Sequence, residues 1–309
     1  MSAPLLPHDP GTPHDPSKPH DPSKPLPIEA EQLWEVNSAW WQASFTEGAD
    51  PEYREQIVPI LSQLLAEAAP ASVLDIGCGE GQLSRVAAGL PSVRHVVGVD
   101  PTLSQLEAAV SRGGPAGNDG AGARDANARD AKARDDGHGH RATGPAGVAY
   151  ARATAISLPF PDMSFDAAFA CLVFEHIEGT VDAIAEVGRV LRPGAAFLLF
   201  MNHPLLQVPG SGWVDDDILG EQYWRIGPYL QENHSVEEVD KNVWIPFVHR
   251  PLSVYVNALV AAGLYLTKMI EPAPPAGFLE KAEEYRQAAA FPRLLVLRAG
   301  KLACTERPA

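Results

Sequence analysis

Cysteine is scarce in this chain of 309 residues, which contains only Cys78, Cys171 and Cys304. The three are odd in number, far apart, and without the paired spacing of zinc ligands. A disulfide framework and a structural zinc site are therefore disfavoured, and we predict no metal site. Unpaired thiols also suit the reducing conditions of the cytoplasm, where we expect the protein to be located.

Positive charge is scarce as well, because 24 Lys and Arg residues stand against 39 Asp and Glu residues and leave a net charge of −15 at pH 7. Binding to nucleic acid or to an anionic membrane needs clustered basic residues, so neither partner is expected. No apolar run reaches transmembrane length, and residues 1–10 lack the pattern of a secretory signal. The composition favours a small neutral or cationic molecule as partner and leaves the oligomeric state open.

Proline and glycine, in contrast, are abundant, with 29 and 26 residues. His-Asp-Pro recurs from His8, His14 and His20 in a segment without an apolar face, so residues 1–27 are predicted to be a disordered tail. Residues 112–147 consist mainly of Gly, Ala, Asp and Arg and are predicted to be a disordered insertion. Residues 28–309 should otherwise form one domain, with a second insert at residues 202–247.

A short apolar run at residues 73–76 ends at three alternating glycines, in the order Asp75-Ile-Gly77-Cys-Gly79-Glu-Gly81. Glycine permits positive φ and lets a ligand approach bare backbone, so this stretch predicts a strand that ends in a ligand-binding turn. A helix over residues 82–88 would direct its amino-terminal amides at the same ligand. The spacing differs from the G-x-G-x-x-G of dinucleotide sites, and an acid at position 75 would repel a pyrophosphate. A ligand end that carries both an ammonium and a carboxylate fits better.

This stretch resembles motif I of the class I S-adenosylmethionine-dependent methyltransferases, in particular the type 11-like branch that acts on small molecules. The resemblance implies S-adenosylmethionine as cofactor. Asp100 follows the next apolar strand, at the position where nucleotide-binding folds place an acid that accepts from ribose hydroxyls. Residues 154–160, Thr-Ala-Ile-Ser-Leu-Pro-Phe, are similar to the adenine-binding segment of the family, with Thr154 in place of its usual acid. The predicted cofactor-binding residues are Asp75, Gly77, Cys78, Gly79, Gly81, Asp100, Thr154, Ala155 and Cys171.

Alternating strand and helix patterns predict an α/β fold, and the resemblance implies the Rossmann-like class I methyltransferase type, with a seven-stranded, mostly parallel sheet. Residues 264–270 and 294–297 should form a closing antiparallel strand pair. Helices are expected over residues 28–45 and 52–68, with Pro59 as a kink or as the true start of the second one. The first helix carries a broad aromatic face, which either closes over the donor and acceptor site, as in the family, or simply packs on the domain.

Transfer of a methyl group from a sulfonium needs mainly orientation of the acceptor and exclusion of water. An oxygen or carbon acceptor would also need a base, and the candidates are His249, His176 and His203, with His249 preferred because it precedes a helix at the predicted substrate face. The chain lacks the Asn/Asp-Pro-Pro-aromatic motif of nucleic-acid and amide methylases. We therefore predict methyl transfer to a small-molecule acceptor. The alternative is a non-catalytic S-adenosylmethionine-binding protein, and a nicotinamide-dependent oxidoreductase is disfavoured by the glycine spacing.

Overall fold

A seven-stranded sheet forms the centre of the protein in the computed structural model, which describes residues 30–46, 50–113, 147–280 and 287–302. The predicted tail at residues 1–27 and residues 114–146 of the predicted insertion lie outside this description. At the borders of that insertion the chain is regular, since a helix continues through Gly113 and a strand begins at Gly147. No helix within the described ranges is long and apolar enough to cross a membrane.

The strands are arranged in the order β10-β11-β5-β4-β1-β2-β3. All pairs from β5 to β3 are parallel, whereas β11 runs antiparallel to both β5 and β10. This topology confirms the predicted fold class, including the closing antiparallel pair. The strand bounds are β1 Ser72–Ile76, β2 His95–Asp100, β3 Gly147–Arg152, β4 Phe165–Cys171, β5 Leu191–Asn202, β10 Leu264–Ile270 and β11 Leu294–Lys301.

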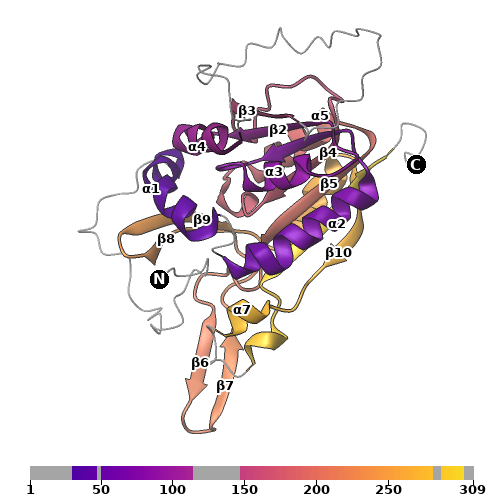
Figure 1. The fold of residues 1–309 in the computed structure, drawn as a ribbon. Coiled ribbons are helices and arrows are strands. Elements are labelled where there is room, and N and C mark those ends of the chain that lie inside the picture. Colours follow the sequence, from indigo (N-terminus) through magenta and orange to yellow (C-terminus); the bar gives the residue numbers. More distant parts are fainter. Residues whose placement is uncertain (1–29, 47–49, 114–146, 281–286, 303–309) are drawn as a thin grey trace, which may run out of the picture.

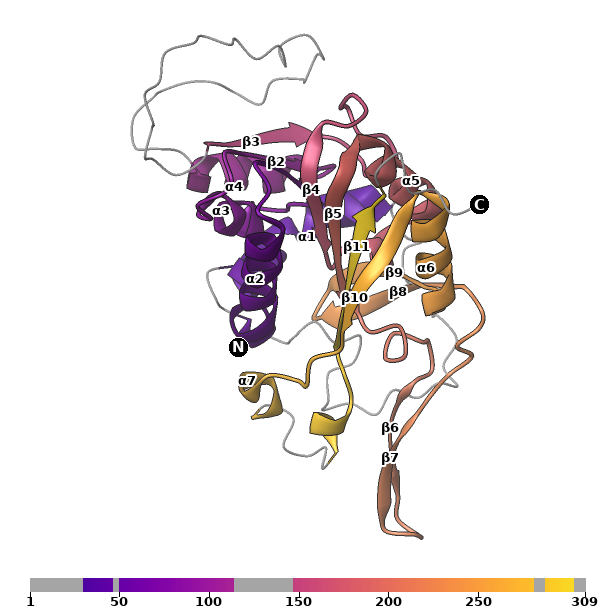
Figure 2. The same ribbon diagram turned by 90° about the vertical axis from the view of Figure 1, so that its right-hand side faces the viewer.

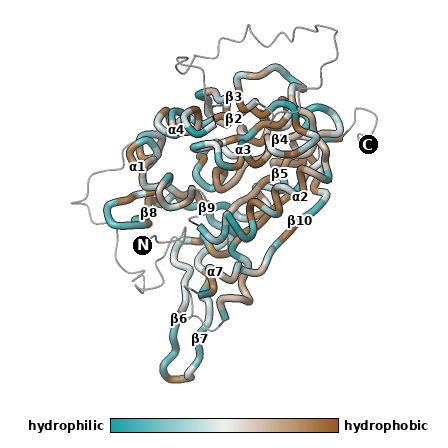
Figure 3. Tube along the Cα trace, in the orientation of Figure 1, coloured by the Kyte–Doolittle hydropathy of each residue, from teal (hydrophilic) through white to brown (hydrophobic). Residues whose placement is uncertain are grey.

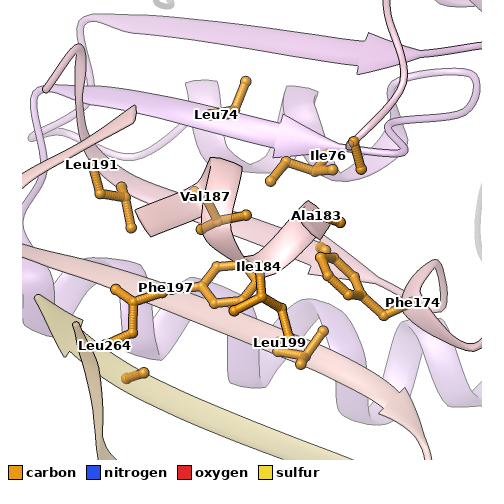
Figure 4. Packing of buried hydrophobic residues seen from close by; sticks show 14 of the residues in the cluster. Leu74, Ile76, Phe174, Ala183, Ile184, Val187, Leu191, Phe197, Leu199 and Leu264 are labelled. Carbon is orange, nitrogen blue, oxygen red and sulfur yellow. The ribbon is translucent and has the colours of Figure 1, made fainter. Parts of the chain in front are cut away.

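Helices cover both faces of the sheet, with α2 (Val58–Ala68), α3 (Gln82–Ala88) and α4 (Leu103–Gly113) on one side and α5 (Thr180–Val190) and α6 (Leu252–Ala261) on the other (Figure 2). Because successive strand residues point to opposite faces, Val73 belongs to the core under α2 and α3, whereas Leu74 and Ile76 belong to the core under α5 and α6. Figure 4 shows Leu74 and Ile76 with Ile184 and Val187 of α5 in that second core. The hydropathy colouring places the hydrophobic residues mainly along these central strands (Figure 3).

The helix predicted over residues 52–68 is divided before Pro59. A π-helical segment, Tyr53–Ile57, comes first, and regular α-helix begins at Val58 with the proline in its first positions. Proline lacks an amide hydrogen and is tolerated in the first turn, where that hydrogen has no partner inside the helix. Pro59 therefore lies close to the true start of α2, which was one of the two predicted outcomes.

Several segments outside the central seven-stranded sheet lie at the carboxyl ends of its parallel strands (Figure 1). Helix α1 (Ala30–Phe45) packs against the hairpin of β8 (Asn233–Asp240) and β9 (Val243–His249). A second hairpin, β6 (Gly212–Asp216) and β7 (Glu221–Arg225), projects away from the domain. The short helices are η3 Phe174–His176, α7 Ala276–Leu279 and η4 Ala288–Ala290. The insert at residues 202–247 thus contains ordered strands that its sequence pattern did not predict.

Candidate functional site

A cavity of about 560 Å³ opens at the carboxyl ends of β1, β2 and β4, below α1. The sequence-predicted residues that line it are Asp75, Gly77, Cys78, Gly79, Asp100, Thr154, Ala155, Cys171 and His176. Three predicted residues, Gly81, His203 and His249, do not line it. The fold therefore brings most of the predicted cofactor-binding residues together, although their roles remain predictions.

The glycine turn after β1 forms one wall of the cavity. Gly77, Gly79 and Gly81 all have positive φ, at +69°, +52° and +79°. The amides of Gly77 and Cys78 donate to the carbonyl of Val99 at 2.8 and 3.0 Å, which fixes the turn to β2. A Cβ at Gly77 would overlap Val173, whereas a Cβ at Gly79 would meet no atom within 4 Å. Gly79 is therefore the place where a ligand can approach the backbone closely.

Asp100 connects the glycine turn to the start of α4. Its Oδ2 accepts from the amide of Gly79 at 2.9 Å, and its Oδ1 accepts from the amide of Thr102 at 2.8 Å. Burial raises the pKa of this carboxyl, while the two amides oppose the rise. Each carboxylate oxygen keeps a further lone pair, so the side chain can still accept from hydroxyl groups in the cavity.

Asp75 lies at the bottom of the cavity and is 2% exposed. Ser84 of α3 donates its hydroxyl to Oδ2 of Asp75 at 2.5 Å. Burial raises the pKa of Asp75 to about 7, the bond from Ser84 opposes this, and the neighbouring charge of Asp100 adds to it. A cationic ligand would favour the ionised form. Ser84 was not predicted as a site residue. The sequence feature that could have identified it is a polar residue on the buried face of the helix that follows the turn.

The remaining predicted binding residues lie beside this wall. Thr154 forms an isolated bridge with Ser157 in the loop after β3, and both Thr154 and Ala155 line the cavity. Cys78 and Cys171 are free, buried thiols, and burial raises the pKa of both well above the usual range, so both stay protonated. They act as small, uncharged parts of the lining.

The charged side chains that line the cavity are acidic. Among the described lining residues there are four acids, Asp75, Glu80, Asp100 and Glu178, and no Lys or Arg. Glu80 is neutralised by Arg85 and Arg112, whose guanidinium groups lie at 2.8 and 2.7 Å. The excess negative charge at Asp75 and Asp100 fits a ligand that carries positive charge, such as a sulfonium with an ammonium group.

The three histidines named as base candidates have different surroundings. His176 lines the cavity, and its Nδ1 donates to the carbonyl of Pro246 at 2.6 Å. His203 lies elsewhere, with Nε2 at 2.8 Å from Oε1 of Glu271, and the Nε2 of His249 lies 2.8 Å from the carbonyl of Tyr229. The structure thus leaves His176 as the cavity-lining member of the set.

Aromatic side chains of α1 form the roof of the cavity. Trp34, Trp41 and Phe45 line it, and Tyr53 joins them from the following helix. Trp41 lies 5.4 Å from Trp34 and 4.4 Å from Phe45 between ring centroids. The aromatic face therefore both packs against the domain and closes the site. Tyr53 was not predicted as a site residue, because its position in an otherwise apolar helical pattern is typical of a residue in the hydrophobic core.

Side-chain hydrogen bonds hold α1 in place from two directions. Glu35 accepts from the amides of Leu103 and Ser104, at the start of α4, at 2.8 and 3.0 Å. On the other side, Asn37 donates to the carbonyl of Trp244 and Trp40 donates to Asp240, both at 2.8 Å. These contacts connect the roof both to the start of α4 and to the β8–β9 hairpin.

Comparison with known proteins agrees with this geometry. A family model described as a methyltransferase domain matches residues 74–199. The O-methyltransferase resE of Aspergillus sclerotiorum is 25% identical over 223 residues, which cover 67% of this chain and 74% of that protein. The O-methyltransferase rstn1 of Aspergillus nomiae is 25% identical over 197 residues, which cover 59% of this chain and 75% of that protein.

Solved structures of methyltransferases have a similar fold. The crystal structure of an S-adenosylmethionine-dependent methyltransferase from Mesorhizobium loti superposes with a TM-score of 0.59 at 24% identity and covers 82% of this chain and 98% of that one. The strand order, the glycine turn and the family match lead to the same conclusion. Residues 74–199 match a methyltransferase domain, and the chain has the fold of the class I S-adenosylmethionine-dependent methyltransferases.

Proposed function

We propose that the protein transfers the methyl group of S-adenosylmethionine to a small-molecule acceptor by in-line displacement, and that positioning supplies most of the catalysis. The observation that carries this proposal is that one cavity is lined both by the glycine turn and by the aromatic roof. Its volume of about 560 Å³ lies within the usual range of small-molecule sites. Donor and acceptor would share this space, with α1 excluding water.

The residues around the cavity fit the donor. Asp100 would accept from the ribose hydroxyls, and Thr154 with the amide of Ala155 would hold the adenine. Asp75 and the open backbone at Gly79 would receive the amino-acid end, whose ammonium suits the buried acid. The bound donor supplies a methyl group that is already activated by its sulfonium. The chain itself has to orient the acceptor opposite that group and keep water out.

An oxygen atom is the acceptor that we propose. The fungal relatives are named as O-methyltransferases, and transfer to a hydroxyl oxygen releases a proton that a cavity histidine can take up. We also infer that the protein acts in the cytoplasm, because Cys78 and Cys171 are free thiols in the part of the chain that the structure describes.

Calorimetric titration with S-adenosylmethionine, and separately with NADH, tests the cofactor assignment. We expect binding of S-adenosylmethionine alone, weakened at least tenfold, or about 1.4 kcal/mol, in both Asp75→Asn and Asp100→Asn. Asp182→Asn is the matched control, because Asp182 is an exposed acid in the first turn of α5. If the folded protein fails to bind S-adenosylmethionine, the proposal is wrong. Formation of S-adenosylhomocysteine with an acceptor separates an enzyme from the non-catalytic binding protein.

A further inference from the structure

His176 is held in one tautomer by its contact with the β8–β9 hairpin. A carbonyl oxygen can only accept, so the 2.6 Å contact with Pro246 requires the proton on Nδ1. Nε2 is then left with its lone pair. This atom is buried and has no hydrogen-bond partner among the described residues. A buried acceptor without a partner is unfavourable, and a ligand that donates a hydrogen bond to it would remove this cost.

The imidazole is enclosed by flat apolar groups. The Trp34 ring lies edge-on to it, with centroids 4.9 Å apart and planes at 77°. The Phe247 ring lies 4.7 Å away at 51°. Val173 and Ile177 line the cavity on either side of η3. An acceptor bound at Nε2 would contact the indole of Trp34, which lines the cavity beside His176, and a planar ring makes the largest contact with such a surface.

The charge of the lining restricts the acceptor further. The described lining contains no Lys or Arg, and Glu178 lies beside Ile177 at the cavity. A carboxylate or phosphate on the acceptor would be buried near acids and without a basic side chain to pair with, which is strongly unfavourable. An uncharged hydroxyl has no such penalty and can donate to Nε2.

We propose that the acceptor is an uncharged aromatic alcohol, whose ring packs against Trp34 and whose hydroxyl donates its proton to Nε2 of His176. This inference rests on the proposed function and names its substrate class. The hydroxyl oxygen forms the new O–C bond, the C–S bond of the sulfonium breaks with its electron pair left on sulfur, and the O–H bond breaks with its electrons left on oxygen. The proton passes to Nε2, so one positive charge is lost at sulfur and one is gained at the imidazole.

The protonation state of His176 is compatible with this role. Burial lowers its pKa to about 4, so the imidazole is neutral at neutral pH and its lone pair is available. A base this weak does not deprotonate an alcohol in advance. Proton transfer instead accompanies O–C bond formation, which makes the hydroxyl strongly acidic.

The base is tested with His176→Asn, because the asparagine amide can keep a donor near Pro246 but has no group at the position of Nε2. We expect the turnover number to fall 100-fold or more, as for loss of a general base, while the dissociation constant for S-adenosylmethionine changes less than threefold. His95→Asn is the control, since this histidine is exposed at the amino end of β2, away from the cavity. Undiminished turnover in His176→Asn would overturn the role of the histidine.

The substrate class is tested with 2-naphthol, 2-naphthoic acid and decahydro-2-naphthol, which have similar carbon frames. We expect 2-naphthol to give the tightest binding by calorimetry and the fastest S-adenosylhomocysteine formation. Its binding should also change the tryptophan fluorescence of the wild type more than that of Trp34→Phe. Equal or better use of the carboxylate or the saturated alcohol contradicts the proposal, as does failure of all three while S-adenosylmethionine binds. Failure to bind S-adenosylmethionine would instead refute the proposed function itself.

Discussion

The glycines of the turn after β1 have similar backbone angles but different neighbours, so their substitutions should separate folding from binding. In Gly79→Ala, the methyl group meets no protein atom within 4 Å, and the cost to folding is that of the left-handed conformation, about 1–2 kcal/mol. The same methyl group occupies space that we assign to the donor. We expect a folded protein with at least tenfold weaker binding of S-adenosylmethionine by calorimetry.

Gly77→Ala should instead damage the fold, because its Cβ overlaps Val173 in addition to the strained φ of +69°. Denaturant unfolding should show a larger loss of stability than for Gly79→Ala. Val173→Ala in the same chain should restore part of that loss, since it removes the overlapping methyl groups. Equal unfolding free energies for the two alanine variants would contradict this reading of the turn.

Side-chain contacts at a few positions hold helix α1 above the cavity. Substitution of one of these residues should therefore affect the position of the whole helix. Glu35 satisfies two amides at the start of α4, next to the Asp100 contact with Thr102. Glu35→Ala should cost about 1 kcal/mol, as for other lost helix caps, and should weaken S-adenosylmethionine binding severalfold. Urea unfolding and calorimetry check both values.

Glu107→Ala is the matched control for this helix contact, because Glu107 lies exposed on α4 itself. The proposed coupling between roof and donor site would be wrong if the Glu35 variant lost stability but bound S-adenosylmethionine normally. It would also be wrong if the two alanine variants behaved alike.

The elements with strong apolar periodicity were predictable from sequence, whereas the strands of the insert at residues 202–247 were not. Strand β10 and helix α3 have the bounds that the sequence predicted, since each is an apolar or amphipathic run between clear turn signals. In the β8–β9 hairpin only β9 is mostly buried, whereas β8 is largely exposed. The hairpin contacts α1, which is about 200 residues away in sequence, and local patterns carry no information about such a contact.

The same limit applies to the site. Asp75, Gly79 and Asp100 follow from one local motif and its register with the next strand, and the structure brings these predicted residues into one cavity lining. The choice among His176, His203 and His249 depended on tertiary placement. His249 was preferred for preceding a helix, but it ends β9 and lies outside the cavity lining, while the less favoured His176 faces the ligand space.

On the scale of the whole molecule, the proposed donor site joins elements from distant parts of the chain, so its occupancy should stabilise the entire fold. The cavity takes residues from α1, from the turns after β1 and β2, and from the segments after β3 and β4. A ligand that binds only the native state at 100 times its dissociation constant adds about 2.7 kcal/mol to the free energy of unfolding. For a domain of this size we expect S-adenosylmethionine to raise the melting temperature by about 5–10 °C.

A thermal melt monitored by circular dichroism measures this shift, with NADH and Gly79→Ala as the two controls. NADH should leave the melting temperature unchanged, because the acids of the cavity disfavour a pyrophosphate. Gly79→Ala should show a smaller shift than the wild type at the same ligand concentration, since its added methyl group weakens binding without disrupting the core. A shift with NADH that equals the shift with S-adenosylmethionine would mean that the cavity does not select for positive charge. An undiminished shift in Gly79→Ala would mean that the ligand does not lie against the glycine turn.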